Sequence, residues 1–114
     1  MLATSTLDCK RFYGDVMFPF QLTLFDAPIN LGVNTHNLDG HPNREEYQMS
    51  IEGKEILLQN RMTVKDLGWP GWVENSLTLD PGTSKGLELT VVHTNDPPRM
   101  LKPVLAHVQC HEAK

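Results

Sequence analysis

The C-terminal segment 104–111, VLAHVQCH, holds the densest group of chemically capable side chains in the chain. As a strand, it would place Cys110 with its apolar residues on one face and His107 with His111 on the other. The two histidines would then lie roughly 13 Å apart, which is too far to share one ion. Only a bend after Val108, or a pairing of His107 with His93 on a neighbouring strand, would bring ligands together. Zinc sites need three or four ligands, so we expect no metal and no cofactor.

A second polar group lies between Asn34 and Asn43, where the chain is rich in Asn, Asp and Gly. Residues 29–43 are expected to form a long loop, with at most a short strand at 29–33, and long loops are often functional. The candidate ligand-binding residues in this loop are Asn34, His36, Asp39 and His41. Their polar tips could hold the hydroxyls of a sugar. The alternative is a solvated loop that satisfies its own backbone.

Trp69 and Trp72 flank Pro70-Gly71, and so short a turn cannot easily bury both indoles. An exposed aromatic pair is a stacking surface for a sugar or an anchor for a protein partner. Alternatively, one of the two tryptophans covers an open end of the core. We predict that both tryptophans belong to the ligand-binding set.

A different hypothesis is a small β-barrel enzyme, either an isomerase or cyclase or a metal-dependent catalyst. Its pocket would be lined by Tyr13, His93 and His107, since histidine can transfer protons near neutral pH. No serine lies in a G-x-S-x-G context, and the glycines are too widely spaced for a phosphate-binding loop. The sequence therefore nominates no reaction. A small soluble module that recognises a protein or carbohydrate through loops at one end of the fold is favoured over the enzyme.

These side chains must be positioned by short strands, because apolar and polar residues alternate through much of the chain. The alternation is strongest at 16–25, 87–94 and 102–111, and residues 45–60 resemble a hairpin around Gly53. No amphipathic helix of ten residues is evident. The sequence predicts an all-β fold, namely an antiparallel β-sandwich or jelly-roll-like barrel of about seven or eight short strands with no substantial helix.

The same alternation predicts which residues are buried. The expected core comprises Phe18, Phe20, Leu22, Leu24, Met49, Ile51, Ile56, Leu58, Leu77, Leu79, Leu87, Leu89, Val91, Val104, Ala106 and Val108.

Length and charge limit the class of protein. The 114 residues fit a single domain, 1–114, and the net charge is −4 with the lysines and arginines scattered. No basic stripe marks a nucleic-acid surface, so we expect no nucleic acid. Neither a signal peptide nor a long apolar run is evident, which favours a soluble cytoplasmic protein without a membrane partner. A homodimer through a sheet edge or face is favoured over a monomer.

The two cysteines, Cys9 and Cys110, lie near opposite ends of the chain. Chain termini are often close in space, so a disulfide between them is geometrically possible. A reducing cytosol would favour free thiols instead, with Cys110 as a small buried residue and Cys9 near the surface.

Overall fold

The computed structural model describes residues 3–25, 30–38, 40–63, 71–95 and 98–113. Over these ranges all regular structure is β, and no helix there is long and apolar enough to cross a membrane. The strands are β1 (Ala3–Tyr13), β2 (Val16–Phe25), β3 (Leu31–Leu38), β4 (His41–Glu52), β5 (Glu55–Thr63), β6 (Gly71–Asp80), β7 (Lys85–Asn95), β8 (Pro98–Met100) and β9 (Val104–Glu112).

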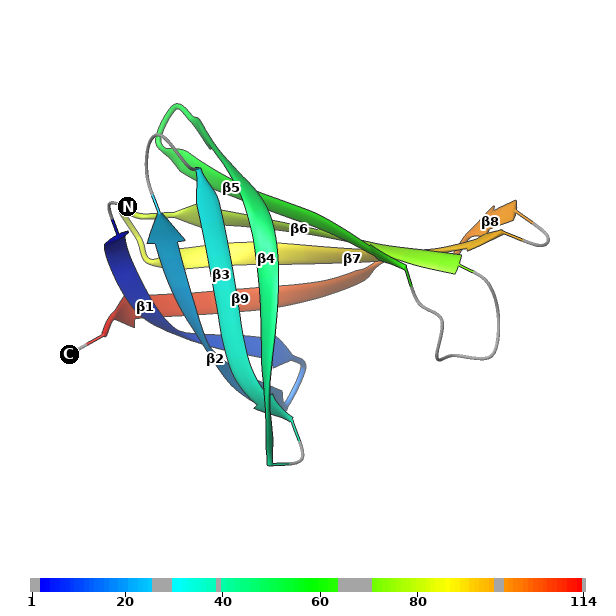
Figure 1. Ribbon diagram of the computed structural model, residues 1–114, viewed down its shortest axis with the longest axis horizontal. Helices are drawn as coiled ribbons and strands as arrows, with labels where there is room; N and C mark the ends of the chain where they lie inside the picture. Colours follow the sequence, from blue (N-terminus) through cyan, green and yellow to red (C-terminus); the bar gives the residue numbers. More distant parts are fainter. Residues whose placement is uncertain (1–2, 26–29, 39, 64–70, 96–97, 114) are drawn as a thin grey trace.

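Eight of these strands close into an antiparallel barrel. Each strand from β1 to β6 pairs with the next along the chain, β7 pairs with β9, and β9 returns to β1. The short β8 pairs with the end of β7 and projects beyond the barrel (Figure 1). The predicted all-β antiparallel fold is confirmed, and the chain forms a closed barrel rather than an open sandwich.

An apolar core fills one end of this barrel. It is formed by alternate residues of each strand, as on β2, where Phe20, Leu22 and Leu24 are buried and Gln21 is exposed. The other members of this core cluster are Cys9, Tyr47, Met49, Leu58, Leu77, Leu79, Val108 and Cys110, with Leu7 and Ile56 packed against it.

Towards the other end the barrel wall separates. The pairing of β4 with β5 stops at Gln48 and Gln59, although β4 continues to pair with β3 as far as His41. Similarly, β2 and β3 pair only up to Gln21 and Thr35. Pro19, which has no N–H to donate, lies just beyond that last β2–β3 pair. Figure 1 shows β2, β3 and β4 diverging from β5, β6 and β7, so this end of the barrel is open.

The expectation of a long loop over 29–43 is wrong for most of that segment. Residues Leu31–Leu38 form β3, and Leu38 pairs with His41 at the start of β4. Gly40 has a positive φ of 79°, which a two-residue hairpin turn requires. The segment is polar because Thr35 and Asn37 are exposed on its outer face, while Asn34 and His36 form hydrogen bonds on its inner face. It therefore lacks the apolar alternation that identifies a strand.

The expected core is also wrong at its β7 members. Leu87 and Leu89 are 46% and 39% exposed, and Glu88 between them is only 3% exposed. Val91 shares the outer face with the two leucines. The alternation of β7 therefore predicts the strand correctly, but the residues expected to face the core are the ones that face outward. Three further predicted core residues near strand ends are also exposed, namely Phe18, Ile51 and Val104.

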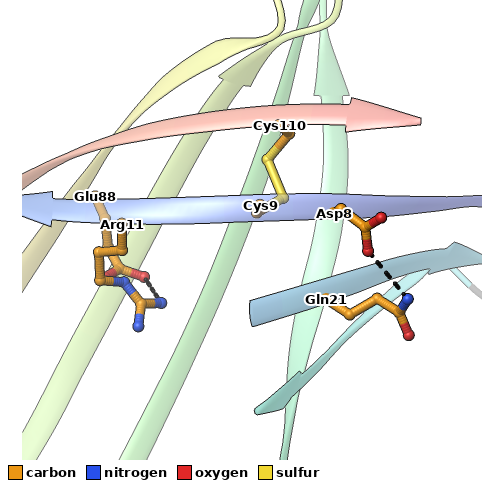
Figure 2. The surroundings of a disulfide bond; sticks show 6 residues. All are labelled: Asp8, Cys9, Arg11, Gln21, Glu88 and Cys110. Atoms are coloured by element: carbon orange, nitrogen blue, oxygen red, sulfur yellow. Dashed lines mark hydrogen bonds and ion pairs between the residues drawn. A yellow bond between two sulfur atoms is a disulfide. The ribbon is translucent and has the colours of Figure 1, made fainter. Parts of the chain in front are cut away.

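A disulfide joins Cys9 to Cys110, so the prediction of free thiols is wrong. The two residues are directly opposite on β1 and β9, with their Cα atoms 4.0 Å apart, and both are buried in the core (Figure 2). Since β1 and β9 are the strands whose pairing closes the barrel, the bond fastens that closure across 101 residues of sequence.

Candidate functional site

Beyond the apolar core, the inward faces of the strands become polar. Arg11 follows Cys9 on the inner face of β1, and Glu88 lies opposite the buried Leu77 and Ala106. The other inward polar residues of this half are Tyr13, Asn34, His36, Glu45, Tyr47, Asn60, Asn75 and Thr90. The polar side chains of the interior therefore gather toward the open end, where Phe18, Val73, Val92 and Val104 also face inward.

Arg11 and Glu88 form a two-point ion pair inside the barrel. Nε of Arg11 lies 2.6 Å from Oε1 of Glu88, and Nη2 donates to Oε2 at 2.9 Å (Figure 2). The guanidinium also lies 4.6 Å from the centre of the Phe20 ring. Burial raises the pKa of Glu88, and attraction to Arg11 offsets only part of that rise. Burial alone would lower the pKa of Arg11, but the charge of Glu88, smaller electrostatic contributions from Tyr13 and Tyr47 and the hydrogen bond to Glu88 together outweigh burial, so the pKa is raised.

A chain of hydrogen bonds runs along the inner face of β3 and β4. The Tyr47 hydroxyl donates to Oε2 of Glu45 at 3.2 Å and accepts from Nδ2 of Asn34 at 3.4 Å. Asn34 Oδ1 lies 3.1 Å from Nδ1 of His36. Burial, followed by the charge of Glu45, raises the pKa of Tyr47, so this phenol stays protonated and keeps its proton directed at the carboxylate.

Amide and hydroxyl groups form a second row across β5, β6 and β7. Asn75 donates from Nδ2 to Oδ1 of Asn60 at 2.9 Å, and the Thr90 hydroxyl donates to Oδ1 of Asn75 at 2.9 Å. These residues are directly opposite one another on neighbouring strands. The first row lies on the β3 and β4 side of the interior, and the second row lies on the β5, β6 and β7 side. These two sides separate where β4 and β5 stop pairing.

A cleft of about 530 Å³ lies where β4 and β5 stop pairing. Tyr47 and Asn60, whose neighbours Gln48 and Gln59 form the last pair of the two strands, link this cleft to the two polar rows. The lining is dominated by hydrogen-bonding side chains, namely Glu46, Tyr47, Gln48, Gln59, Asn60, Arg61 and Glu74, with Leu31 as the apolar member. The cleft suits a small ligand with many hydrogen-bonding groups.

Trp72 lies on the outside of the barrel in a stack of three side chains. Its ring is parallel to that of His93, with the centroids 3.6 Å apart, and the Arg61 guanidinium lies 4.0 Å from the indole centre. Glu74 contacts the edge of the His93 ring, with Nε2 of His93 and Oε2 of Glu74 3.4 Å apart. Both faces of the indole are therefore covered, which leaves its edge for contact with a ligand. Trp69 lies outside the described residues.

The other predicted ligand-binding residues are separated from Trp72. Asn34 and His36 belong to the inner hydrogen-bond chain, whereas His41 is exposed at the β3–β4 turn. Asp39 lies outside the described residues. The β3–β4 turn with His41 and the start of β6 with Trp72 lie at the same end of the barrel. However, β3 and β4 diverge from β6 there, so these residues are not brought together (Figure 1).

The alternative pocket of Tyr13, His93 and His107 is not assembled. Tyr13 faces inward, while His93 is in the outer stack and His107 is exposed on the outer face of β9. His107 pairs with Leu87, six residues from His93, which corresponds to roughly 20 Å along β7. Within the described ranges, no three His, Cys, Asp or Glu side chains are arranged to hold a metal ion.

The sequence reasoning missed most of the polar interior, including Arg11, Glu45, Tyr47, Asn60 and Glu88. A signal was present on two strands. Arg11 continues the same alternate positions as Leu7 and Cys9, and Glu88 is an acid between two leucines, Leu87 and Leu89. A charged residue on a predicted inward face indicates either a buried pair or a site.

No protein-family model, curated protein or solved structure matches this chain.

Proposed function

We propose that this chain is a binding module that takes a carbohydrate in the cleft between β4 and β5. The observation that carries the proposal is the lining of that cleft, where amide, carboxylate and guanidinium groups surround a volume of about 530 Å³. The proposal retains the binding module expected from the sequence. It moves the site from loops at one end of the barrel to the side of its wall.

The chemistry of the lining favours a sugar over other small ligands. Each sugar hydroxyl both donates and accepts a hydrogen bond, and the amides of Gln48, Gln59 and Asn60 offer both partners at once. Glu46 and Glu74 add acceptors, and Arg61 adds donors. A site with both acids and a base does not select strongly for a charged ligand, and about 530 Å³ is within the usual range for ligand pockets.

A binding role is also favoured over the alternative enzyme. That hypothesis rested on histidines in an enclosed pocket, and His93 and His107 lie apart on the outside of the barrel. The interior phenol and amides instead hold fixed hydrogen-bond partners. Such satisfied groups position a ligand rather than react with it.

Nuclear magnetic resonance titration with a panel of mono- and disaccharides tests the proposal. We expect at least one sugar to shift the amide signals of residues 46–48, 59–61 and 74 at millimolar concentration. The double variant Gln48→Ala/Gln59→Ala should bind about tenfold or more weakly, because it loses hydrogen bonds worth about 1 kcal/mol each. Gln109→Ala, on the outer face of β9, is the matched control and should bind like wild type. The absence of shifts in the cleft with every sugar would contradict the proposal.

The disulfide bears on the compartment in which this binding takes place. Disulfides persist in oxidising compartments and are rare in the cytosol of most organisms, so we infer an oxidising compartment instead of the cytoplasm expected from the sequence. Free-thiol titration of the denatured protein isolated from its native source should find no free Cys9 or Cys110. Two titratable thiols would favour the cytoplasm.

A further inference from the structure

The outside of the barrel carries an apolar surface that contributes nothing to its core. Leu87 and Leu89 on β7 and Leu105 on β9 are 46%, 39% and 54% exposed, and Leu89 is directly opposite Leu105. Val91 continues the row along β7. We name these four residues the outer leucine face. Contiguous exposed apolar residues on a soluble domain usually mark an interaction surface.

The sequence of β7 makes this exposure significant. Between Leu87 and Val91 the strand alternates apolar and polar residues, so either Leu87, Leu89 and Val91 or Glu88 and Thr90 could have faced the core. The polar set faces inward, where Glu88 pairs with Arg11 and Thr90 bonds to Asn75. Three apolar side chains are therefore turned to the outside, at a cost in hydrophobic burial that a partner surface would recover.

Charges of opposite sign mark the two ends of this face. Lys85, which is exposed, lies four residues before Leu89 on β7. His93 lies four residues after Leu89 and is bound to Glu74, whose side chain is 41% exposed. The outward positions of β7 between these ends carry no charge.

We propose that the outer leucine face binds a second copy of this chain, with the two β7 strands antiparallel about a two-fold axis at Leu89. A two-fold contact is self-complementary, so each residue of one copy faces the residue of the other copy that is equally far from the axis on the opposite side. Leu89 then packs on Leu89, Leu87 packs on Val91, and Lys85 of each copy lies over the Glu74 and His93 pair of the other. Sheets packed face to face lie about 10 Å apart, which these side chains can fill.

The charges select this orientation over the other symmetric one. If the two β7 strands ran parallel, Lys85 would face Lys85, and Leu105 would face Ser76 on β6, which is opposite Leu89. Like charges in direct opposition are unfavourable, and a leucine against a serine buries less apolar area. The antiparallel arrangement avoids both costs.

Sedimentation equilibrium and light scattering over micromolar to millimolar protein test the proposal, and neither depends on a bound ligand. We expect wild type to dimerise. Leu89→Glu should weaken the dimer at least a hundredfold, because it places two carboxylates at the axis. Ile51→Glu is the control, since Ile51 is 61% exposed but lies near the β4–β5 turn. It should dimerise like wild type.

A charge exchange tests the orientation. Lys85→Glu and Glu74→Lys should each weaken the dimer about tenfold, and the double variant should dimerise more tightly than either single variant. A wild type that is monomeric at all concentrations would overturn the proposal, as would a Leu89→Glu variant that retains the dimer mass. Binding of a monomer to anionic lipid vesicles through the same face would overturn it in favour of a membrane surface.

Discussion

Arg11 and Glu88 meet inside the barrel although 77 residues separate them and β9 lies between their strands. Their side chains are only 16% and 4% exposed. Removing one partner of a buried ion pair leaves an uncompensated charge, which is much more costly than removing both. The pair therefore acts as a unit, and its stability contribution depends on both members.

Arg11→Met should lower the free energy of unfolding by about 3 kcal/mol, because the Glu88 carboxylate then lacks its partner. The double variant Arg11→Met/Glu88→Leu removes both charges and should come within about 1 kcal/mol of wild type. Urea denaturation followed by circular dichroism measures both values. Equal losses in the single and double variants would contradict the ion-pair argument.

The raised pKa of Glu88 also predicts how the free energy of unfolding depends on pH. Burial raises its folded-state pKa above the ordinary value of 4.5, so the folded protein holds this proton more tightly than the unfolded chain. The contribution of Glu88 is therefore largest below about pH 4.5 and is lost as the pH rises through the raised pKa. Glu88→Gln lacks this titration.

The measurement is the difference in unfolding free energy between wild type and Glu88→Gln, followed by urea denaturation from pH 4 to pH 7. We expect this difference to fall as the pH rises, while the other carboxyl groups cancel in the comparison. A difference that grows with pH would mean that Arg11 lowers the pKa of Glu88 more than burial raises it.

The sequence predicted the strands whose alternation coincides with burial, and β2 illustrates why. Phe20, Leu22 and Leu24 are spaced by two and all face the core. On β7 the same period was visible, but the period alone does not say which set of residues faces inward. That choice depends on Arg11, which lies on a strand far away in sequence and supplies the inward partner of Glu88.

The candidate cleft could not be predicted from the sequence for a related reason. Its position depends on where β4 and β5 stop pairing, at Gln48 and Gln59, and neither residue is a turn former or a strand breaker. The separation results from how the strands twist around the whole barrel. Similarly, β3 has a polar sequence although Asn34 is buried and hydrogen-bonded to Tyr47 and His36, so hydropathy did not distinguish it from a loop.

Gly86 lies where β7 closely approaches the backbone of β6 in the barrel wall. A Cβ at this position would overlap the backbone carbonyl oxygen of Thr78 on β6, which cannot move aside as a side chain can. Gly86→Ala should therefore lower the free energy of unfolding by about 2 kcal/mol through overpacking. Gly82→Ala is the control, because its nearest neighbour is the partly exposed Asp80 side chain, and it should change stability by less than about 0.5 kcal/mol. Thermal denaturation of the two variants distinguishes these effects.

The Cys9–Cys110 disulfide should stabilise the barrel without being required for its fold. It closes a loop of 101 residues, and a crosslink over so long a loop is expected to contribute about 2–4 kcal/mol by restricting the unfolded chain. Residues 7–12 of β1 pair with 107–112 of β9 along the same interface, so the ring stays closed when the bond is reduced. We expect reduced protein to keep the circular dichroism spectrum of the oxidised form but to unfold at a lower urea concentration. Cys9→Ala/Cys110→Ala should match the reduced protein and should not respond to reductant. Loss of the β spectrum on reduction would show instead that backbone pairing alone cannot hold β1 against β9.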